Sequence, residues 1–550
     1  MYYYVSSVLY WCNEYIKDLI LGVPDFNYAG GKFMLRLPAI FSNHMVFQRE
    51  KNILLWGESN AQSVTAVIGD NKKISTDVKD GKWEIELPPM EAGGPYELEV
   101  SDGNETKKYI DIMLGEVWLA GGQSNMELEL QNSKNGKEVC ANVKDEGVRY
   151  YYTPKVSWVG EELSEAEKQS EWQHCTPDTC KKWSAVAYYF AKKLSKELGV
   201  TVGIIGCNWG GTSASCWTSR EFMEQETLLK PYLDKYDKAV KGQDIEEYIK
   251  AREDYIKYQA EFDKNVGHYY QTAENPTWDE AISLFGENQY PGPMGPRNET
   301  RPCGLYESLL KRVMPYTLRG FLYYQGEEDD HMPYTYYTML STLVRQWRHD
   351  WRDDELPFMC VQLPMFKNDG EPDYHNWPFI REAQMRLFKT VKNTGIAVIL
   401  DKGEYGNIHP VEKDVVGERL CEQALYHVYK KNNEKSAFGP VYNSYETDKN
   451  KMILHFEHAD GGMECRGQQL SGFEIAGDDK KYYVASAEIC GNTIVVSAED
   501  VEKPKYARYC WTNYAEVTLY GKNGIPAAPF RTSYDDGAVA TGSRNEGVWE

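Results

Sequence analysis

The sequence predicts a central α/β domain with a mainly parallel sheet, flanked on both sides by smaller β-rich units. Apolar strands alternate with helices between residues 113 and 432, which is typical of a parallel sheet covered by helices. On either side, short strands are separated by turns, which indicates β-sandwich-like units. The chain has 550 residues, a length that suits several domains rather than one.

Residues 1–34 are predicted to form a short amphipathic helix and a linker. Apolar residues between Val8 and Ile20 recur at helical spacing, and Gly22 and Pro24 end the pattern. The segment lacks a basic start and a long apolar run, so we expect neither a signal peptide nor a membrane span and place the protein in the cytoplasm. The apolar face is expected to dock on the body or on a second copy, which leaves a homodimer open.

Residues 35–112 are predicted to form a small antiparallel β-sandwich. Segments 53–57 and 63–69 read as strands, and segment 83–87 alternates cleanly between polar and apolar residues. Residues 80–81 and 93–95 supply glycine-containing turns between them.

Residues 113–432 are expected to hold the α/β domain. Its strands are predicted at 200–206, 318–324, 358–363 and 394–400. The alternation breaks between 217 and 301, where a charged helix at 243–264 carries an apolar stripe. We interpret 217–301 as a helical insertion that packs on the body, with a lid over the site as the alternative.

Residues 433–550 are predicted to form a second β-rich unit followed by a tail. Short strands are expected at 451–456, 482–485, 493–497 and 515–520. The chain after residue 533 is rich in Gly, Asp and Ser, so the tail is expected to be loose.

Composition excludes some classes of partner. The formal net charge of −22 argues against binding to nucleic acid or to an anionic membrane surface.

The 12 cysteines are scattered without a CxxC pair, which suits free thiols in a reducing compartment. His455 and His458 lie on an expected strand and no HExxH helix is present, so no metal site is predicted. The 41 Tyr and 15 Trp could fill cores or stack on sugar rings.

A serine lies at the most informative turn of the chain. The apolar segment 115–120 is followed by Gly121, Gly122, Gln123 and Ser124, and then by residues 127–130, which read as a helix start. A hydroxyl between a strand and a helix lies beside outward-pointing N–H groups that favour negative charge, as an acyl-transfer nucleophile requires. The alternative is an ordinary glycine-serine turn.

Three further loops follow predicted strands. His409, in a loop after the strand at 394–400, is the candidate base, because the carboxyl ends of parallel strands share one edge of a sheet. The loops at 208–212 and 324–328 carry glycines and carboxamides that could approach an oxyanion. Each loop alone could be a surface turn, but together they favour a site.

These loops resemble the motifs of the sialate O-acetylesterase family of carbohydrate esterases, which are SGNH hydrolases. They read Gly-Gln-Ser-Asn-Met at 122–126, Trp-Gly-Gly-Thr at 209–212, Tyr-Gln-Gly-Glu at 324–327 and Ile-His-Pro at 408–410. Further matching segments lie at 40–49, 356–364, 381–384, 472–477 and 526–532. The resemblance covers roughly residues 35–533 and implies a flavodoxin-like α/β fold with no metal or organic cofactor.

The resemblance also assigns roles to individual residues. Ser124 would be the nucleophile and His409 the general base. The oxyanion hole would combine the N–H of Ser124, the N–H of Gly210 or preferably Gly211, and the side chain of Gln325. Gln123 and Arg381 are assigned to substrate binding, and Glu327 is expected to brace its loop.

The third member of the triad stays open at this point. Many SGNH enzymes place an acid three residues before the histidine, but here that position is Gly406. Asp401, at a strand end, is the first candidate to orient the imidazole, and Glu404 is the second. A Ser–His pair oriented by a backbone carbonyl is the remaining alternative.

The sequence therefore predicts a carbohydrate O-acetylesterase that works through an acetyl-serine intermediate. The substrate would be an O-acetylated sugar, either an acetylated sialic acid or an acetylated xylo- or manno-oligosaccharide. Two alternatives remain: a non-catalytic carbohydrate-binding protein, and a lipase or thioesterase on the same scaffold.

Overall fold

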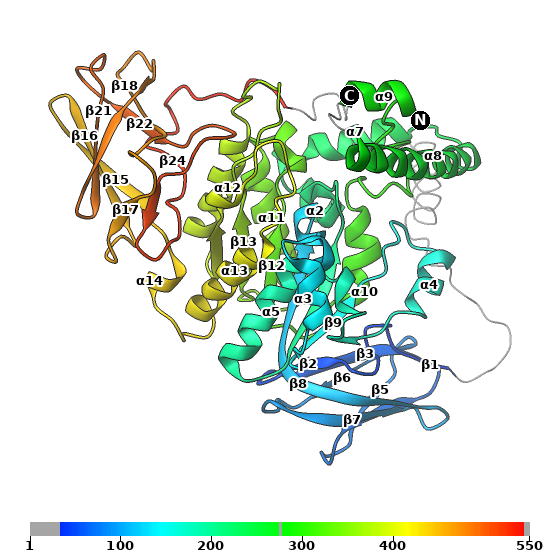
Figure 1. The fold of residues 1–550 in the computed structure, drawn as a ribbon. Coiled ribbons are helices and arrows are strands. Elements are labelled where there is room, and N and C mark those ends of the chain that lie inside the picture. The colour runs from blue at the N-terminus through cyan, green and yellow to red at the C-terminus, as the bar shows by residue number, and fades with distance from the viewer. Residues whose placement is uncertain (1–33, 274–277, 544–550) are drawn as a thin grey trace, which may run out of the picture.

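One long strand, β8 (Thr106–Gly122), connects the N-terminal β unit to the central α/β domain. The computed structural model describes residues 34–273 and 278–543 (Figure 1). The predicted N-terminal amphipathic helix lies outside these residues. The lower half of β8 pairs with strands of the β unit, and its upper half is a central strand of the parallel sheet.

The central sheet has the strand order expected of a doubly wound α/β domain. The order is β10 (Gln173–His174), β9 (Val148–Tyr152), β11 (Val202–Asn208), β8, β12 (Gly320–Tyr324), β13 (Phe358–Gln362) and β14 (Thr394–Val398). All neighbours are parallel except the edge pair of β9 and β10. With β9 and β10 set aside, the order counted from β8 is 2-1-3-4-5, as in flavodoxin-like sheets. The predicted α/β class is confirmed.

Helices cover both faces of this sheet. Helices α5 (Ala185–Leu198) and α13 (Lys413–His427) pack together, as do α11 (Tyr336–Asp350) and α12 (Trp377–Thr390). Alternation along β8 points Trp118 at Phe190 of α5, with ring centroids 5.2 Å apart. A side chain at Gly121 would instead meet Trp347 of α11. The strands are buried on both faces, which explains their continuous apolar sequences.

The N-terminal β unit contains the strands expected from its sequence. Three form one sheet: β1 (Leu35–Arg36), β3 (Ile53–Ser59) and β6 (Lys82–Leu87). The others extend from β8: β2 (Val46–Gln48), β4 (Ser63–Ile68), β5 (Ile74–Asp77) and β7 (Gly93–Ser101). In β6, exposed and buried residues alternate strictly, because one face covers the core.

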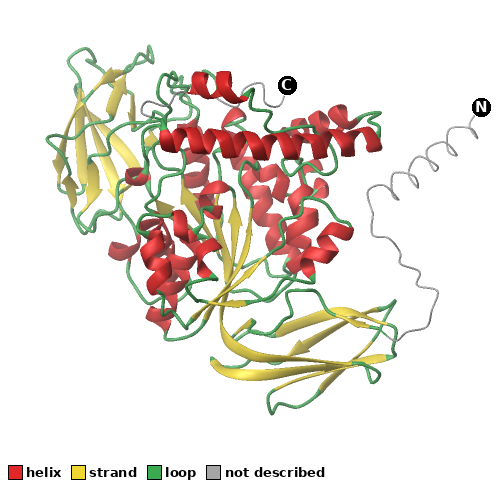
Figure 2. Ribbon diagram, turned by 45° about the vertical axis from the view of Figure 1, so that its right-hand side comes forward, coloured by secondary structure: helices red, strands yellow, loops and turns green. Residues whose placement is uncertain are grey.

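The interruption after β11 is helical, as predicted. It contains α6 (Arg220–Glu224), α7 (Lys230–Val240), α8 (Ile245–Thr272) and α9 (Trp278–Phe285). The carboxylate of Asp244 caps α8 by accepting hydrogen bonds from the N–H groups of Glu246 and Glu247. Figure 1 shows α8 at the upper right, above the end of the sheet where α2 (Ser124–Glu127) begins, and in Figure 2 this long helix runs across the upper part of the molecule.

The C-terminal β unit consists of short antiparallel sheets. One has the order β15 (Val441–Asp448), β16 (Lys451–Glu457), β21 (Thr493–Ser497), β20 (Ser486–Cys490). A second has the order β19 (Tyr483–Val484), β18 (Phe473–Ala476), β22 (Tyr506–Tyr509), β24 (Phe530–Arg531), and β17 (Met463–Cys465) pairs with β23 (Leu519–Gly521).

The described part of the tail, residues 534–543, is less loose than its composition predicts. The N–H of Ala540 donates to Tyr334 Oη at 2.7 Å, and the N–H of Thr541 donates to the carbonyl of Tyr374 at 2.8 Å. These contacts tie residues 540–541 to the α/β domain. Among the described helices, none is both long and apolar enough to cross a bilayer.

Short helices fill the remaining connections. They are α3 (Gly136–Asn142), α4 (Glu161–Glu167), α10 (Lys311–Val313) and α14 (Glu434–Ala437).

Candidate active site

Ser124 begins a short helix directly at the end of β8. Gly122 has a φ of +137°, and a Cβ there would lie 2.1 Å from the carbonyl oxygen of Tyr324, so the turn requires glycine. The helix starts at Ser124 and ends at Glu127, which corrects the predicted start at residue 127. The N–H of Ser124 belongs to the first turn and therefore has no partner within the helix.

His409 reaches Ser124 from a loop that follows β14. Its Nε2 lies 2.8 Å from Ser124 Oγ, the distance of a hydrogen bond between a nucleophile and its base. The structure thus brings together the two residues that the sequence pairs. They meet because both loops leave carboxyl ends of parallel strands in the same sheet.

The carboxylate of Glu404 braces the loop that carries His409. It accepts hydrogen bonds from Asn407 Nδ2 at 2.8 Å and from the N–H of Val411 at 2.9 Å. Asn407 Oδ1 in turn accepts from the N–H of His409 at 3.0 Å. Glu404 therefore holds the loop in shape on both sides of His409, and its oxygens are used for that purpose.

Asp401 does not lie against His409. Its two carboxylate oxygens accept from the guanidinium of Arg419 on α13, at 2.6 and 3.0 Å. The prediction that Asp401 orients the imidazole is therefore not supported by the structure, because its side chain turns toward α13 after β14. The two acid candidates are therefore engaged elsewhere, Asp401 with Arg419 and Glu404 with the backbone and Asn407 of the His409 loop.

The glycine loop after β11 lies against Ser124. A Cβ built on Gly210 would lie 3.3 Å from Ser124 Cβ, so the loop packs against the nucleophile. The N–H of Gly210 donates to Glu127 Oε2 and is thereby occupied. Gly211 has a φ of +68°, and its N–H has no acceptor among the described residues. The N–H groups of Ser124 and Gly211 are thus available to an oxyanion.

Gln325 is not an available oxyanion donor, contrary to prediction. Its side chain is 1 % exposed, and its Nε2 lies 2.6 Å from Asp329 Oδ2 and 3.1 Å from Gln123 Oε1. Its Oε1 accepts from Tyr336 Oη at 2.8 Å. Strong hydrogen bonds to buried partners hold the carboxamide within the protein, because a buried amide must satisfy its polar atoms.

Gln123 is part of the same network. Its Oε1 accepts from Gln325 Nε2 and from the N–H groups of Gly326 and Glu328, at 3.1, 3.4 and 3.1 Å. Its side chain therefore joins the nucleophile turn to the loop after β12. The structure supports this positioning role in place of the predicted contact with substrate.

Arg381 lies in the interior and not in the site. It is fully buried, and it donates to the carbonyls of Leu363, Pro364, Thr512 and Asn513. Burial lowers the pKa of its guanidinium to about 10. The prediction that Arg381 binds substrate is wrong, because its Nε, Nη1 and Nη2 all donate to main-chain carbonyls, two directly after β13 and two in the C-terminal unit.

A buried hydrogen-bond network next to the nucleophile, formed by Asn125, Glu327 and Lys413, was not predicted from the sequence. Asn125 Nδ2 donates to Glu327 Oε1 at 2.6 Å and to the carbonyl of Ile408 at 2.9 Å, next to His409. Lys413 Nζ donates to Asn125 Oδ1. Burial lowers the pKa of Lys413 to about 7. The available signal was the sequence position of Asn125 beside Ser124 and of Lys413 just after the His409 loop.

Aromatic and charged side chains lie beside the glycine loop that packs against Ser124. Tyr290 Oη donates to the carbonyl of Gly211 at 2.7 Å, which ties the helical insertion to the oxyanion loop. Lys155 pairs with Glu127 and lies over the rings of Tyr152 and Trp209, 5.5 and 5.8 Å from their centroids. This rim offers ring faces, a cation and an anion within reach of Ser124 and its neighbours.

Comparison with known sequences identifies related proteins. A family described as "Carbohydrate esterase, sialic acid-specific acetylesterase" matches residues 297–424. The sialate O-acetylesterase of Mus musculus is 25 % identical over 556 residues, covering 90 % of this chain and 94 % of that protein. The sialate O-acetylesterase of Homo sapiens is 23 % identical over 545 residues, covering 90 % and 92 %.

A solved structure matches over most of the fold. A carbohydrate acetylesterase from Xanthomonas citri shares 27 % sequence identity and superposes with a TM-score of 0.73. The match covers 91 % of this chain and 99 % of that chain. Together these matches confirm the resemblance that the sequence predicts.

Proposed function

We propose that this chain, a carbohydrate esterase of the sialate O-acetylesterase type, removes acetyl groups from sugar hydroxyls through an acetyl-serine intermediate on Ser124. The observation that carries the proposal is the 2.8 Å contact between His409 Nε2 and Ser124 Oγ. The open N–H groups of Ser124 and Gly211 beside it suit the charge that develops on an attacked carbonyl.

The reaction follows from this geometry in two halves. His409 Nε2 takes the proton of Ser124 as Oγ attacks the acetyl carbon, and the two N–H groups hold the oxyanion. The C–O bond to the sugar then breaks, and the sugar oxygen leaves with the proton from His409. Water next loses a proton to His409 and attacks the acetyl-serine, and Ser124 Oγ departs with that proton as acetate is released.

The rim supports a sugar rather than a long acyl chain. Trp209 is partly exposed and Tyr290 is 37 % exposed, and aromatic faces of this kind stack on sugar rings. An acetylated sialic acid also carries a carboxylate, for which Lys155 is the cation at the rim. Acetylated xylo- or manno-oligosaccharides, which need no cation, are the alternative substrate.

The test compares acetate release by the wild type, Ser124→Ala and Ser164→Ala. Ser164 is an exposed serine on α4 and serves as the matched control. We expect wild-type activity in the control and a loss on the order of 10⁴-fold or more in kcat for Ser124→Ala. Equal turnover by all three proteins would contradict the proposal, and no turnover by any would favour a non-catalytic sugar-binding protein.

A second arm of the test distinguishes the substrates. O-acetylated sialic acid is compared with acetylated xylo- and manno-oligosaccharides, and nitrophenyl esters of increasing chain length are included. A rate that falls steeply from acetate to butyrate supports the sugar esterase. A rate that rises with chain length would instead indicate the lipase or thioesterase alternative.

The organisation around the site is part of the same proposal. We assign residues 35–112 to a β-sandwich-like unit, 113–432 to the hydrolase domain with its insertion at 217–301, and 433–550 to a second, β-rich flanking unit and a tail. The cysteines in the described residues are free thiols, which supports a cytoplasmic location. We also propose that residues 1–34 form a homodimer contact. Light scattering on a chain that lacks residues 1–22 tests this, and the measured particle mass would fall from that of a dimer to that of a monomer if the proposal holds.

A further inference from the structure

Two histidines and an aspartate converge far from Ser124. Asp111 Oδ2 lies 2.7 Å from His44 Nδ1 and 2.7 Å from His174 Nε2, and the two ring nitrogens are 3.2 Å apart. We call these residues the His44–Asp111–His174 cluster. It is the one group of potential metal ligands found among the described residues. All three side chains are partly exposed, so an ion can reach them from solvent.

The spacing of these atoms suits a zinc ion. Zinc bonds to histidine nitrogen and carboxylate oxygen at about 2.0–2.2 Å, which puts tetrahedral ligand atoms about 3.3 Å from one another. The nitrogens of His44 and His174 already have this separation. The carboxylate oxygen is closer to both and needs a small outward movement. Two imidazoles and one carboxylate leave the fourth position for water.

Neighbouring groups hold the cluster in place. Arg149 Nη2 donates to Asp111 Oδ1 at 2.9 Å, which leaves Oδ2 directed at the histidines. Arg149 Nη1 donates to the carbonyl of His44 at 2.9 Å. Partners of this kind orient metal ligands and fix their geometry. The positive charge of Arg149 also opposes a cation, so we expect weaker binding than in a site formed by four thiolates.

The backbone is adapted to this convergence. His44 and Asp111 have φ angles of +66° and +58°, a left-handed conformation that is uncommon for residues other than glycine and in which Asp and His are over-represented among them. His174 lies opposite Arg149 in the pairing of β10 with β9. The cluster thus joins the loop before β2, the middle of β8 and the edge of the central sheet.

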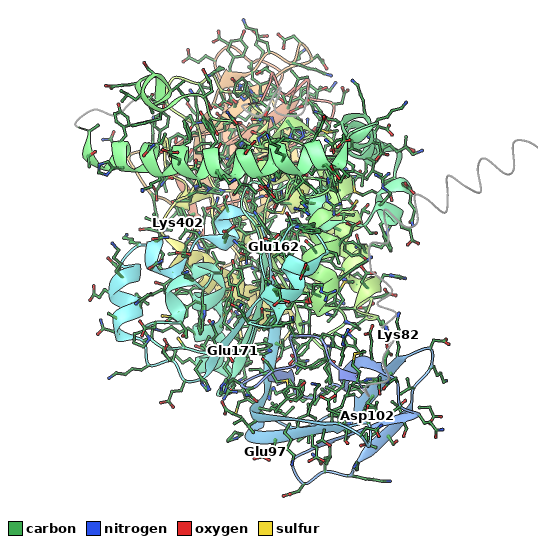
Figure 3. The ribbon with its side chains drawn as sticks, turned by 90° about the vertical axis from the view of Figure 1, so that its right-hand side faces the viewer. Lys82, Glu97, Asp102, Glu162, Glu171 and Lys402 are labelled. Carbon is green, nitrogen blue, oxygen red and sulfur yellow. The ribbon has the colours of Figure 1, made fainter. Side chains whose placement is uncertain are left out.

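The location indicates a structural ion and not a catalytic one. Asp111 precedes Ser124 by 13 residues, most of them in β8, which corresponds to up to roughly 40 Å at about 3.3 Å per residue. Glu171, three residues before His174, is labelled in Figure 3 where the N-terminal β unit meets the α/β domain. An ion here would link the two parts.

We propose that His44, Asp111 and His174 bind one zinc ion that fastens the N-terminal β unit to the α/β domain. The neutral imidazoles and the carboxylate would replace part of the hydration shell of the ion. Because only the folded chain brings these residues together, bound zinc would raise the thermal stability of the protein. This proposal is independent of the esterase activity.

The test uses the full chain, first treated with a chelator and then titrated with zinc chloride. We compare the wild type with His44→Gln, His174→Gln and His349→Gln. His349 lies on the exposed surface of α11 and is the matched control. The readouts are zinc affinity by competition with a chromophoric chelator, Tm with and without zinc, and X-ray absorption at the zinc edge of the loaded protein.

We expect one site in the wild type and in His349→Gln, with nitrogen and oxygen neighbours at about 2.0–2.2 Å and a rise in Tm with zinc. Either cluster variant should bind at least about 10-fold more weakly and lose the rise in Tm. The use of two variants covers the case in which one fails to fold. Absence of binding in the wild type would overturn the proposal.

Two other outcomes would also overturn it. Unchanged affinity in both cluster variants would place the zinc elsewhere. Sulfur neighbours at about 2.3 Å in the absorption spectrum would assign the ion to thiols instead. Cys175 and Cys180 lie close enough to hydrogen-bond to each other and are the nearest such thiols in sequence to His174.

Discussion

At the scale of single residues, the site depends on groups that hold Ser124 and His409 rather than on groups that touch substrate. Asn125 contacts the carbonyl of Ile408 directly before the base, and Lys413 contacts Asn125 from below. Because His409 is carried by a loop, a small displacement of that loop would lengthen its contact with Ser124. Such contacts decide whether a proton can be transferred in the right direction.

Lys413 should give the protein a distinctive pH dependence. Its pKa is lowered to about 7 in the folded state, chiefly by burial, against about 10.4 in an unfolded chain. Between these values the unfolded chain binds more protons, so stability rises with pH in that window. The free energy of unfolding of the wild type relative to Lys413→Met should therefore rise by roughly 2 kcal/mol from pH 7 to pH 9. Urea unfolding at the two pH values measures this, and a difference that does not change with pH would refute the assignment.

Asn125 is expected to act through position and not through chemistry. Asn125→Asp keeps the shape but replaces the two Nδ2 hydrogen bonds to Glu327 and Ile408 with repulsion between oxygens. We expect kcat for acetate release to fall about 10²-fold while KM changes little. Asn132→Asp, at an exposed asparagine in the same region of the chain, is the control. An unchanged kcat in Asn125→Asp would show that Asn125 does not position the catalytic residues.

At the scale of elements, the turn between β8 and α2 is the least tolerant part of the site. Gly122→Ala would place a methyl group 2.1 Å from the carbonyl of Tyr324, at a φ of +137°. We expect a loss of at least about 2–3 kcal/mol in the free energy of unfolding and of most activity. Gly81→Ala is the matched control for φ alone, because it has φ +76° and open space around its Cβ. Equal effects of the two changes on activity would contradict this reading.

The insertion should influence catalysis through one hydrogen bond. Tyr290→Phe removes the donor to the carbonyl of Gly211 while leaving the ring at the rim. Because the Gly211 N–H is assigned to the oxyanion hole, we expect kcat to fall by about 10-fold with a smaller change in KM. Tyr334→Phe, at another exposed tyrosine, should leave kcat unchanged. A change confined to KM would assign Tyr290 to sugar stacking alone.

At the scale of the whole molecule, the C-terminal unit is held to the α/β domain by a buried guanidinium. Arg381 on α12 donates to carbonyls at residues 363–364 and 512–513, which are distant in sequence. Arg381→Met should destabilise the protein by about 3 kcal/mol, because it leaves buried carbonyls without donors. The preference between acetylated sialic acid and neutral acetylated sugars should remain the same. A selective loss of activity on acetylated sialic acid would instead indicate that Arg381 binds substrate.

The sequence was most informative where topology alone determines position. Ser124 and His409 could be paired in advance, since loops at the carboxyl ends of parallel strands must share an edge. The alternating and continuous apolar segments likewise predicted most strands. Gln325 and Arg381 were misassigned because their motifs show which residues are present but not which way a side chain turns. Only the fold reveals that their polar groups are buried against Asp329 and against residues 512–513.

The remaining features could not be read from the sequence for a similar reason. His44 and His174 are 130 positions apart, and no short spacing of ligands marks them. They meet because β10 lies at the edge of the central sheet, and β8 of the same sheet also pairs with strands of the N-terminal unit. Asp401 follows a strand, as the acid of a triad would, but its carboxylate accepts a hydrogen bond from Arg419 on the next helix. Long-range partners decided both outcomes.

The central claim is that Ser124 becomes acetylated during turnover. The most direct measurement is peptide mass spectrometry after rapid acid quenching of the enzyme during hydrolysis of an activated acetyl ester, with Ser124→Ala as the reference. The account predicts an acetyl group on the peptide that contains Ser124, and no acetylated active-site peptide in the variant. Steady turnover with no acetyl-enzyme on that peptide, or with the acetyl group on another residue, would contradict it.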